Sequence, residues 1–355
     1  MRTKANVLVT ASGGIVSQGI IKSLKLSNMK KDHPVMYDIV TSDIDAQAAG
    51  LYQSDIGILV PAASSSDYID YMIKICTEQN IQGIFVGSSE ELFPIAFAKE
   101  KIEKETGAIV FTNPIDVITT GIDKWKTFEF LKKNGLPCAE SSLPENQEDL
   151  IEKFGFPLVV KPREGYGSLH FYIVNNRDEI RQAISAIQHA GWHPIIQEYL
   201  DGKNVEFTSG VVVDRTGKTV MSSISMRKTL KQGQTYKAFV DDFHDVRKSA
   251  EETAMKFGCR GSINIQAKMS ENVPKIFEIN PRFSATCPIR AVAGVNEPDI
   301  VFRNFVLGEE IKIDVYQKLV CMRYWNEVYV PYSTYEKTDN MGRISNSDSF
   351  TMNYF

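Results

Sequence analysis

Two stretches decide how the second half of this chain is read: Gly261-Ser262-Ile263-Asn264-Ile265-Gln266 and Phe277-Glu278-Ile279-Asn280-Pro281-Arg282. Both have the apolar alternation of strands, and residues i and i+2 of a strand point to the same face. Glu278 and Asn280 therefore project together, and Gln266 on a paired strand can join them. Three oxygen-bearing side chains suit Mg²⁺, and Arg282 can stabilise charge on a transferring phosphoryl group. The competing interpretation is a solvated sheet face with chance polar spacing.

Several residues that could contact a nucleotide precede these strands along the chain. They are a lysine, two glycines and an acidic residue. Lys161 ends the strand at 156–162, and a loop containing Gly165 and Gly167 follows. Glycines let such a loop lie close over phosphates and donate backbone N–H groups. The segment 197–202 has the pattern of a connector between lobes, and Glu206 is an acid suited to ribose hydroxyls. The order of these features favours nucleotide binding over unrelated surface positions.

The sequence resembles the ATP-grasp superfamily, and within it a single ATP-binding unit of the carbamoyl-phosphate synthetase large subunit. The resemblance rests on Asn264-Ile265-Gln266 followed by Phe277–Ser284, and it covers roughly residues 113–310. It implies an α/β protein: a Rossmann-like (pre-ATP-grasp) parallel-sheet domain over 1–112, then a two-lobed α+β ATP-grasp domain over 113–310. We expect the lobes to meet near 197–202. Residues 311–355 are expected to form a last strand, over 319–330, and a loose tail from 333.

The resemblance also implies a role for each matching residue. Metal ligands are expected at Gln266, Glu278 and Asn280, and the phosphate-stabilising arginine at Arg282. Nucleotide contacts are expected from Lys124, Lys161, the loop Gly165–Ser168 with Gly167, the hinge residues Glu198 and Leu200, and the ribose acid Glu206. The implied cofactors are ATP and Mg²⁺, with Mn²⁺ as a substitute. Arg227 and Lys228 either face the same cleft or form a surface basic pair.

The first third independently predicts a parallel sheet. Apolar strands at 7–10, 37–41, 55–60, 84–87 and 109–111 alternate with helical stretches, a pattern typical of right-handed crossovers. Gly13-Gly14 lacks the spacing of a dinucleotide or phosphate loop, so a tight strand-to-helix turn is favoured. Glu90-Glu91 reads as favourable charge at a helix start rather than a catalytic pair.

Composition limits the class of protein. The 355 residues include 40 Lys and Arg against 44 Asp and Glu, so nothing indicates nucleic acid or a membrane surface as a partner. Apolar runs are far shorter than a membrane helix. A strand begins at Val7, directly after the first six residues, which leaves no room for the apolar segment of a signal peptide. The five scattered Cys and five His lack disulfide or zinc spacing, although Cys287 near the metal strand could be a nucleophile. We expect a soluble cytoplasmic protein.

The expected activity is an ATP-dependent carboxylate–amine (or carboxylate–thiol) ligase that acts through an acyl phosphate on small molecules. Two alternatives stay open: phosphorylation of bicarbonate or carbamate, and a degenerate nucleotide-binding regulatory subunit. A full carbamoyl-phosphate synthetase subunit has two tandem ATP-grasp copies, and this chain has one, so synthesis of carbamoyl phosphate by this chain alone is not expected. Similar enzymes suggest a homodimer. Arg290 either holds the substrate carboxylate or forms a salt bridge with an acid such as Glu297.

Overall fold

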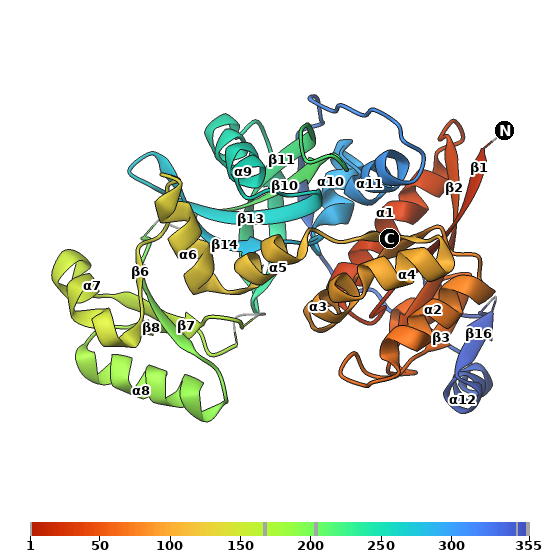
Figure 1. Cartoon of the computed structure of the whole chain (residues 1–355), viewed down its shortest axis with the longest axis horizontal. Coiled ribbons are helices and arrows are strands. Elements are labelled where there is room, and N and C mark those ends of the chain that lie inside the picture. Colours follow the sequence, from red (N-terminus) through yellow and green to blue (C-terminus); the bar gives the residue numbers. More distant parts are fainter. Residues whose placement is uncertain (1, 166–168, 202–204, 346, 353–355) are drawn as a thin grey trace.

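The N-terminal third folds around a six-stranded sheet of order β16-β3-β2-β1-β4-β5 in the computed structural model, which describes residues 2–165, 169–201, 205–345 and 347–352 (Figure 1). Strands β1 to β5 are parallel, as expected from their alternation with helices. They are β1 (Thr3–Val9), β2 (Val35–Asp43), β3 (Ile56–Leu59), β4 (Gly83–Phe85) and β5 (Ile109–Phe111). The connecting helices are α1 (Ile15–Met29), η1 (Ala49–Gln53), α2 (Tyr68–Glu78), α3 (Ser89–Phe97) and α4 (Lys99–Thr106).

A second six-stranded sheet, antiparallel and of order β14-β13-β10-β11-β12-β15, forms the centre of the chain. Its strands are β10 (Glu206–Val213), β11 (Val220–Lys231), β12 (Gln234–Val240), β13 (Gly261–Ser270), β14 (Val273–Asn280) and β15 (Leu319–Met322). The helices that accompany it are α5 (Ile115–Ile122), α6 (Lys124–Lys133), α9 (His244–Lys256), α10 (Cys287–Ala293) and α11 (Glu297–Phe305). One buried cluster joins α1, α10 and α11 to this sheet, so the two parts share a core.

The smaller lobe carries the third sheet, of order β6-β9-β7-β8, and lies apart from the other two sheets in Figure 1. Its elements are β6 (Ser141–Ser142), η2 (Pro144–Asn146), α7 (Gln147–Phe154), β7 (Leu158–Pro162), β8 (Tyr172–Val174), α8 (Arg177–His189) and β9 (Pro194–Glu198). Its core cluster is drawn only from residues 150–196. The α/β fold with a parallel sheet followed by a two-lobed α+β part is confirmed, whereas the predicted domain boundaries stay predictions.

The C-terminal segment departs from the expectation of a loose tail. Residues Tyr332–Met341 form helix α12, and Arg343–Ser345 form β16, which pairs antiparallel with β3 (Figure 1). Ile344 packs in a small cluster with Leu51, Tyr52 and Tyr335. The last strand is also shorter than the predicted 319–330, because β15 ends at Met322. The segment is mostly polar, so its sequence showed no sign that a few apolar residues such as Ile344 pack against the N-terminal part.

Candidate active site

One face of the central sheet gathers the polar residues that the sequence singled out. Directly opposed residues of antiparallel strands share a face, and here Gln266 opposes Glu278 while Asn264 opposes Asn280. On the neighbouring strand Thr208 opposes Gln266. The predicted projection of the three oxygen-bearing side chains to one side is therefore present, and β10 extends it.

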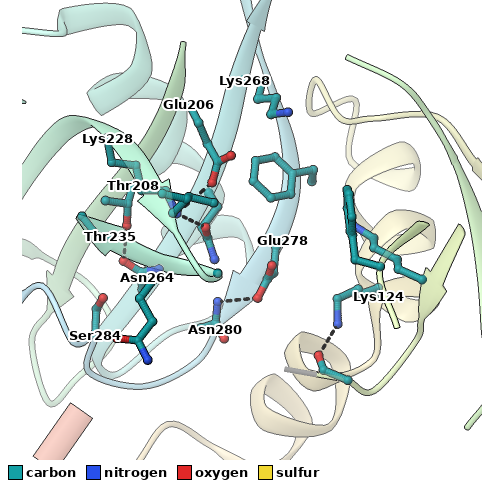
Figure 2. Close-up of a pocket in the computed structure, with 18 of the residues that line it drawn as sticks. Lys124, Glu206, Thr208, Lys228, Thr235, Asn264, Lys268, Glu278, Asn280 and Ser284 are labelled. Carbon is teal, nitrogen blue, oxygen red and sulfur yellow. Dashed lines mark hydrogen bonds and ion pairs between the residues drawn. The ribbon is translucent and has the colours of Figure 1, made fainter. Parts of the chain in front are cut away.

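A cavity of about 560 Å³ opens between this face and the smaller lobe. Figure 2 shows Glu278 and Asn280 on one wall and Lys124 on the other. The predicted site residues that line it are Lys124, Lys161, Gly165, Glu198, Leu200, Glu206, Gln266, Glu278, Asn280 and Arg282. Gly167 and Ser168 lie outside the described residues, and Arg290 does not line the cavity.

Two lysines line the opposite side of the cavity, Lys161 on β7 of the smaller lobe and Lys124 at the start of α6. The Lys161 ammonium donates to Gln197 Oε1 at 2.9 Å and lies 5.4 Å from the ring centroid of Phe277. Burial, reinforced by the neighbouring charge of Lys124, lowers the pKa of Lys161 to about 7. Lys124, in the first turn of α6 behind the capping Asp123, donates to the carbonyl oxygen of Gly165 at 2.7 Å. Burial also lowers the pKa of Lys124, and the nearby charge of Glu278 opposes this effect only in part.

Glu278 supplies the negative charge between these lysines. Burial alone would raise the pKa of this carboxyl, but Lys124, Lys161 and the hydrogen bond from Asn280 bring its pKa below the usual value. The Asn280 amide donates to Glu278 Oε1 at 3.0 Å. Glu278 is thus an ionised carboxylate that faces a cationic wall.

The donor set fits Mg²⁺, which is bound in proteins by one or two carboxylates together with substrate phosphate oxygens and water. Glu278 offers a carboxylate, and Asn280 and Gln266 offer amide oxygens on the same face. Gln266 Oε1 already accepts a hydrogen bond from the Lys228 ammonium at 2.5 Å, so a metal ion would share that oxygen. Within the described residues, no group of three His, Cys, Asp or Glu side chains forms a separate metal cluster.

Glu206 and Lys228 are an ion pair in the wall of this cavity. Their side chains meet at 2.8 Å across β10 and β11, and both line the cavity. This answers the question left open for Lys228, which faces the cleft, whereas Arg227 stacks on Phe239 and is not a lining residue.

The hinge residues Glu198 and Leu200 both line the cavity, and the Glu198 side chain is held by neighbouring groups. The Glu198 carboxylate is buried and bonded to Lys275 with both oxygens at 2.9 Å. It also accepts the backbone N–H of Glu140 at 2.8 Å. The carboxylate is fully engaged in these contacts.

Arg282 follows two residues after the end of β14 and lines the cavity. Its guanidinium donates to the carbonyl oxygen of Phe283 at 2.9 Å and to Asn280 Oδ1 at 3.3 Å. Burial lowers its pKa, and no carboxylate among the described residues forms a salt bridge with it.

The assignment of Arg290 to the substrate is corrected by the structure. Its side chain is fully buried and donates to Glu297 Oε1 at 2.8 Å, to Asn264 at 2.6 Å and to Thr208 at 3.2 Å. The salt bridge with Glu297, the alternative left open above, is what forms. A guanidinium closed off in this way cannot meet a substrate, and its charge serves to satisfy a buried carboxylate.

Cys287 is likewise excluded as a nucleophile. Its thiol is fully buried and donates to Glu297 Oε2 at 3.1 Å. Burial and this carboxylate raise the pKa of Cys287 well above its usual value. A thiolate nucleophile needs the opposite environment.

The Glu90-Glu91 pair and the Gly13-Gly14 turn of the N-terminal part each serve to start a helix. Ser88 caps α3 and accepts from the Glu91 backbone N–H at 3.2 Å, as expected for charge at a helix start. The Glu91 carboxylate is buried and accepts from Thr10 and Tyr68. The Gly13-Gly14 turn leads into α1, whose first residues, Ile15 and Val16, reach the cavity wall.

Sequence reasoning missed several lining residues. Thr208, Asn264, Lys268 and Arg323 all line the cavity. Asn264 and Lys268 lie two residues before and after Gln266, so the strand period would have found them. Arg323, far along the chain, carried no comparable signal.

Comparisons with known proteins place these features in a family. Residues 122–286 match the ATP-grasp domain, and residues 15–111 match the PylC-like N-terminal domain. The chain is 23% identical over 275 residues to the carbamoyl phosphate synthase large chain of Helicobacter pylori strain J99, covering 72% of this chain and 25% of that one. A Methanobrevibacter smithii carbamoyl-phosphate synthase is 22% identical over 281 residues, covering 75% of this chain and 74% of that protein. This chain thus spans about a quarter of the Helicobacter relative's length.

Solved structures agree on the fold. N5-carboxyaminoimidazole synthetase from Staphylococcus aureus, complexed with ADP, superposes with a TM-score of 0.68 at 16% identity, covering 96% of this chain and 87% of that one. The biotin carboxylase domain of Hydrogenobacter thermophilus 2-oxoglutarate carboxylase gives 0.67 at 16% identity, covering 92% and 79%. The family matches show that this chain carries an ATP-grasp domain over residues 122–286, preceded by a PylC-like N-terminal domain over residues 15–111.

Proposed function

We propose that this chain is an ATP-dependent ligase that joins a small-molecule carboxylate to an amine through an acyl phosphate. The observation that carries the proposal is one cavity in which an ionised Glu278 and Asn280 face Lys124 and Lys161 across the lobes. Such a site neutralises a polyphosphate and positions it, which is most of what phosphoryl transfer requires of a protein.

In the proposed reaction a carboxylate oxygen attacks the γ-phosphorus of ATP while the bond to the β–γ bridging oxygen breaks and ADP leaves. The amine nitrogen then attacks the acyl carbon, the bond to the phosphate oxygen breaks, and the nitrogen loses a proton. Lys124, Lys161 and Arg282 offset charge on the phosphates, and Glu206 accepts from a ribose hydroxyl. Gly165 and Leu200 lie against the nucleotide. Mg²⁺ held by Glu278, Asn280 and Gln266 would supply a Lewis acid for the phosphates.

Two other readings are tested by the same measurement. The Hydrogenobacter biotin carboxylase domain was solved with bicarbonate, which supports bicarbonate as a second candidate substrate. A degenerate regulatory subunit is disfavoured because the cations and the metal-binding oxygens are all present in the cavity.

The experiment is a coupled assay of ADP formation with purified chain, Mg²⁺ and ATP, and with bicarbonate, carboxylate pools and amine pools added separately and together. Dependence on a carboxylate and an amine supports the ligase. Bicarbonate-dependent ADP formation without an amine supports the second candidate. Tight MgATP binding with no ADP under any condition would contradict both and favour a regulatory subunit.

We extend the proposal to a homodimer in the cytoplasm. The Hydrogenobacter biotin carboxylase domain was solved as a dimer, and no helix in the described part of this chain is long and apolar enough to cross a membrane. Light scattering of the purified chain tests the first part, and fractionation of cells that express it tests the second.

A further inference from the structure

Arg323 lies in the cavity wall although it comes from beyond the matched ATP-grasp segment. It follows β15 at the edge of the central sheet and is tied there by its backbone N–H, which donates to the Tyr236 carbonyl at 3.0 Å. It lines the cavity together with Ile15, Val16 and Ala285. The C-terminal part of the chain thus contributes a cation to the site.

Among the described residues, the Arg323 guanidinium is held only by neutral groups. It donates to the carbonyl oxygens of Ala285 and Thr235, the second at 3.3 Å, and no described carboxylate forms a salt bridge with it. A guanidinium has five N–H donors, so these two bonds leave donors for a ligand. Half-buried arginines without an acidic partner favour bidentate binding of a carboxylate or phosphate.

The surroundings of Arg323 are also cationic. Lys22 on α1 has its pKa lowered by burial and by the charge of Arg323, which places the two cations close to each other. Helix α1 packs tightly at this point, because a Cβ on Gly19 would meet Pro288 at 3.3 Å and Ala285 at 3.5 Å. The first turn of α1 carries no acidic residue and no side-chain cap, so its free N–H groups and the positive end of its dipole add to the same field.

We propose that Arg323 binds a second anionic oxygen group, carboxylate or phosphate, on the substrate other than ATP, and so selects substrates that carry such a group. The proposal rests on the ligase function above and narrows its substrate class. Arg282 and the lysines serve the reacting phosphates, whereas Arg323 holds a group that takes no part in the chemistry.

The first test compares acids that share a skeleton and differ in the second anionic group. Glycerate and 3-phosphoglycerate, and butyrate and succinate, are each assayed for ADP formation with amine pools. We expect kcat/KM to be at least tenfold higher for the doubly anionic member of one pair. A preference for 3-phosphoglycerate would identify the second group as a phosphate, and a preference for succinate would identify it as a carboxylate. In Arg323→Met the KM for that acid should rise at least tenfold, while Arg323→Lys should recover part of it. Equal use of both members of the pairs, or equal loss of affinity for ATP and for the acid in Arg323→Met, would overturn the proposal.

A second test needs no turnover, so it separates this proposal from the ligase function. Calorimetric titration with inorganic phosphate and with succinate is done at saturating MgADP on wild type, Arg323→Met and the matched surface variant Arg181→Met, whose arginine is exposed on α8. We expect at least tenfold weaker binding of one probe in Arg323→Met alone. Equal binding in all three proteins, or no binding of either probe to the wild type, would overturn the proposal even if ligase activity is found. MgADP binding by each variant shows that it is folded.

Discussion

At the scale of single residues, the site depends on charges held in a partly dehydrated cavity. Lys161 is the strongest case, because burial and Lys124 bring its pKa to about 7, while Glu278 and Glu206 act in the opposite direction. Bound phosphates would restore its charge, since an opposite charge favours the ammonium form. Nucleotide binding should therefore be coupled to a proton.

We predict that nucleotide binding at pH 8 takes up a proton at Lys161. Above pH 7 the free site is mostly neutral at this residue, so affinity for ADP should fall as pH rises, by up to tenfold per unit. Calorimetry in buffers of different ionisation enthalpy measures the uptake. Lys161→Met should lose the uptake and bind more weakly at pH 6, whereas Lys153→Met, at an exposed position, should behave as wild type. Unchanged uptake in Lys161→Met would contradict the assignment.

Glu278→Gln should lower Mg²⁺-dependent turnover roughly 100-fold or more, about 2.7 kcal/mol in the barrier. The amide keeps the shape and the hydrogen bond to Asn280 but loses the charge that a hard cation requires. The check is kcat over a range of Mg²⁺ concentrations, with Glu252→Gln on α9 as an exposed control. Turnover within twofold of wild type would remove Glu278 from the proposed metal site.

The Arg290–Glu297 pair predicts a stability effect rather than a substrate effect. Arg290→Met leaves a fully buried carboxylate without its partner, and the expected loss is about 3–5 kcal/mol in the free energy of unfolding. Chemical denaturation measures it. The double variant Arg290→Met/Glu297→Met should recover much of the loss. A stable Arg290→Met protein with a raised KM for the carboxylate would instead return Arg290 to the substrate.

At the scale of elements, β10 is shaped to admit this pair. Gly210 lies in the middle of the strand, and a Cβ there would overlap the Glu297 carboxylate and the Arg290 guanidinium. The missing side chain is what lets α10 and α11 close onto the sheet. A glycine in a strand interior often marks such a close approach.

Gly210→Ala should therefore destabilise the fold by about 1–3 kcal/mol or more, as overpacking does in a dense core. The expected readout is a lower midpoint of denaturation with an unchanged slope. Combined with Glu297→Ala, which removes the group in the way, the alanine should cost much less. Additive losses in the double variant would show that the overlap is not the cause.

At the scale of the whole molecule, the C-terminal part of the chain packs against the N-terminal sheet. After the central sheet it passes back to the N-terminal sheet, where β16 pairs with β3 and the Gly342 carbonyl accepts from the Leu59 N–H at 2.7 Å. Strand β16 therefore covers the β3 edge of the first sheet.

Ile344→Asp should weaken this closure by about 1–3 kcal/mol, since it places a charge in the cluster with Leu51 and Tyr52. Hydrogen exchange should become faster at the Leu59 amide, while nucleotide binding stays unchanged because the site lies elsewhere. Ser345→Asp, at an exposed position on the same strand, is the matched control. Slow exchange at Leu59 in both variants would show that β16 does not protect this edge.

The sequence by itself determined the fold class and the projection of Glu278 and Asn280 to one side of the central sheet. Strand periodicity is local, so the spacing of Glu278 and Asn280 was enough to put them on one side, and alternating strands and helices were enough for a parallel sheet. The remaining assignments in the cavity came from resemblance to a family, and their roles stay predictions.

Only the tertiary structure decided which charges meet. Arg290 and Arg323 are indistinguishable as letters, yet one is closed against Glu297 and the other lines the cavity without an acidic partner among the described residues. The difference arises because helix packing at Gly210 brings Glu297 to Arg290, while β15 carries Arg323 to the cavity wall from outside the family motif. Contacts between segments distant in sequence depend on how sheets and helices pack, and no local pattern encodes them.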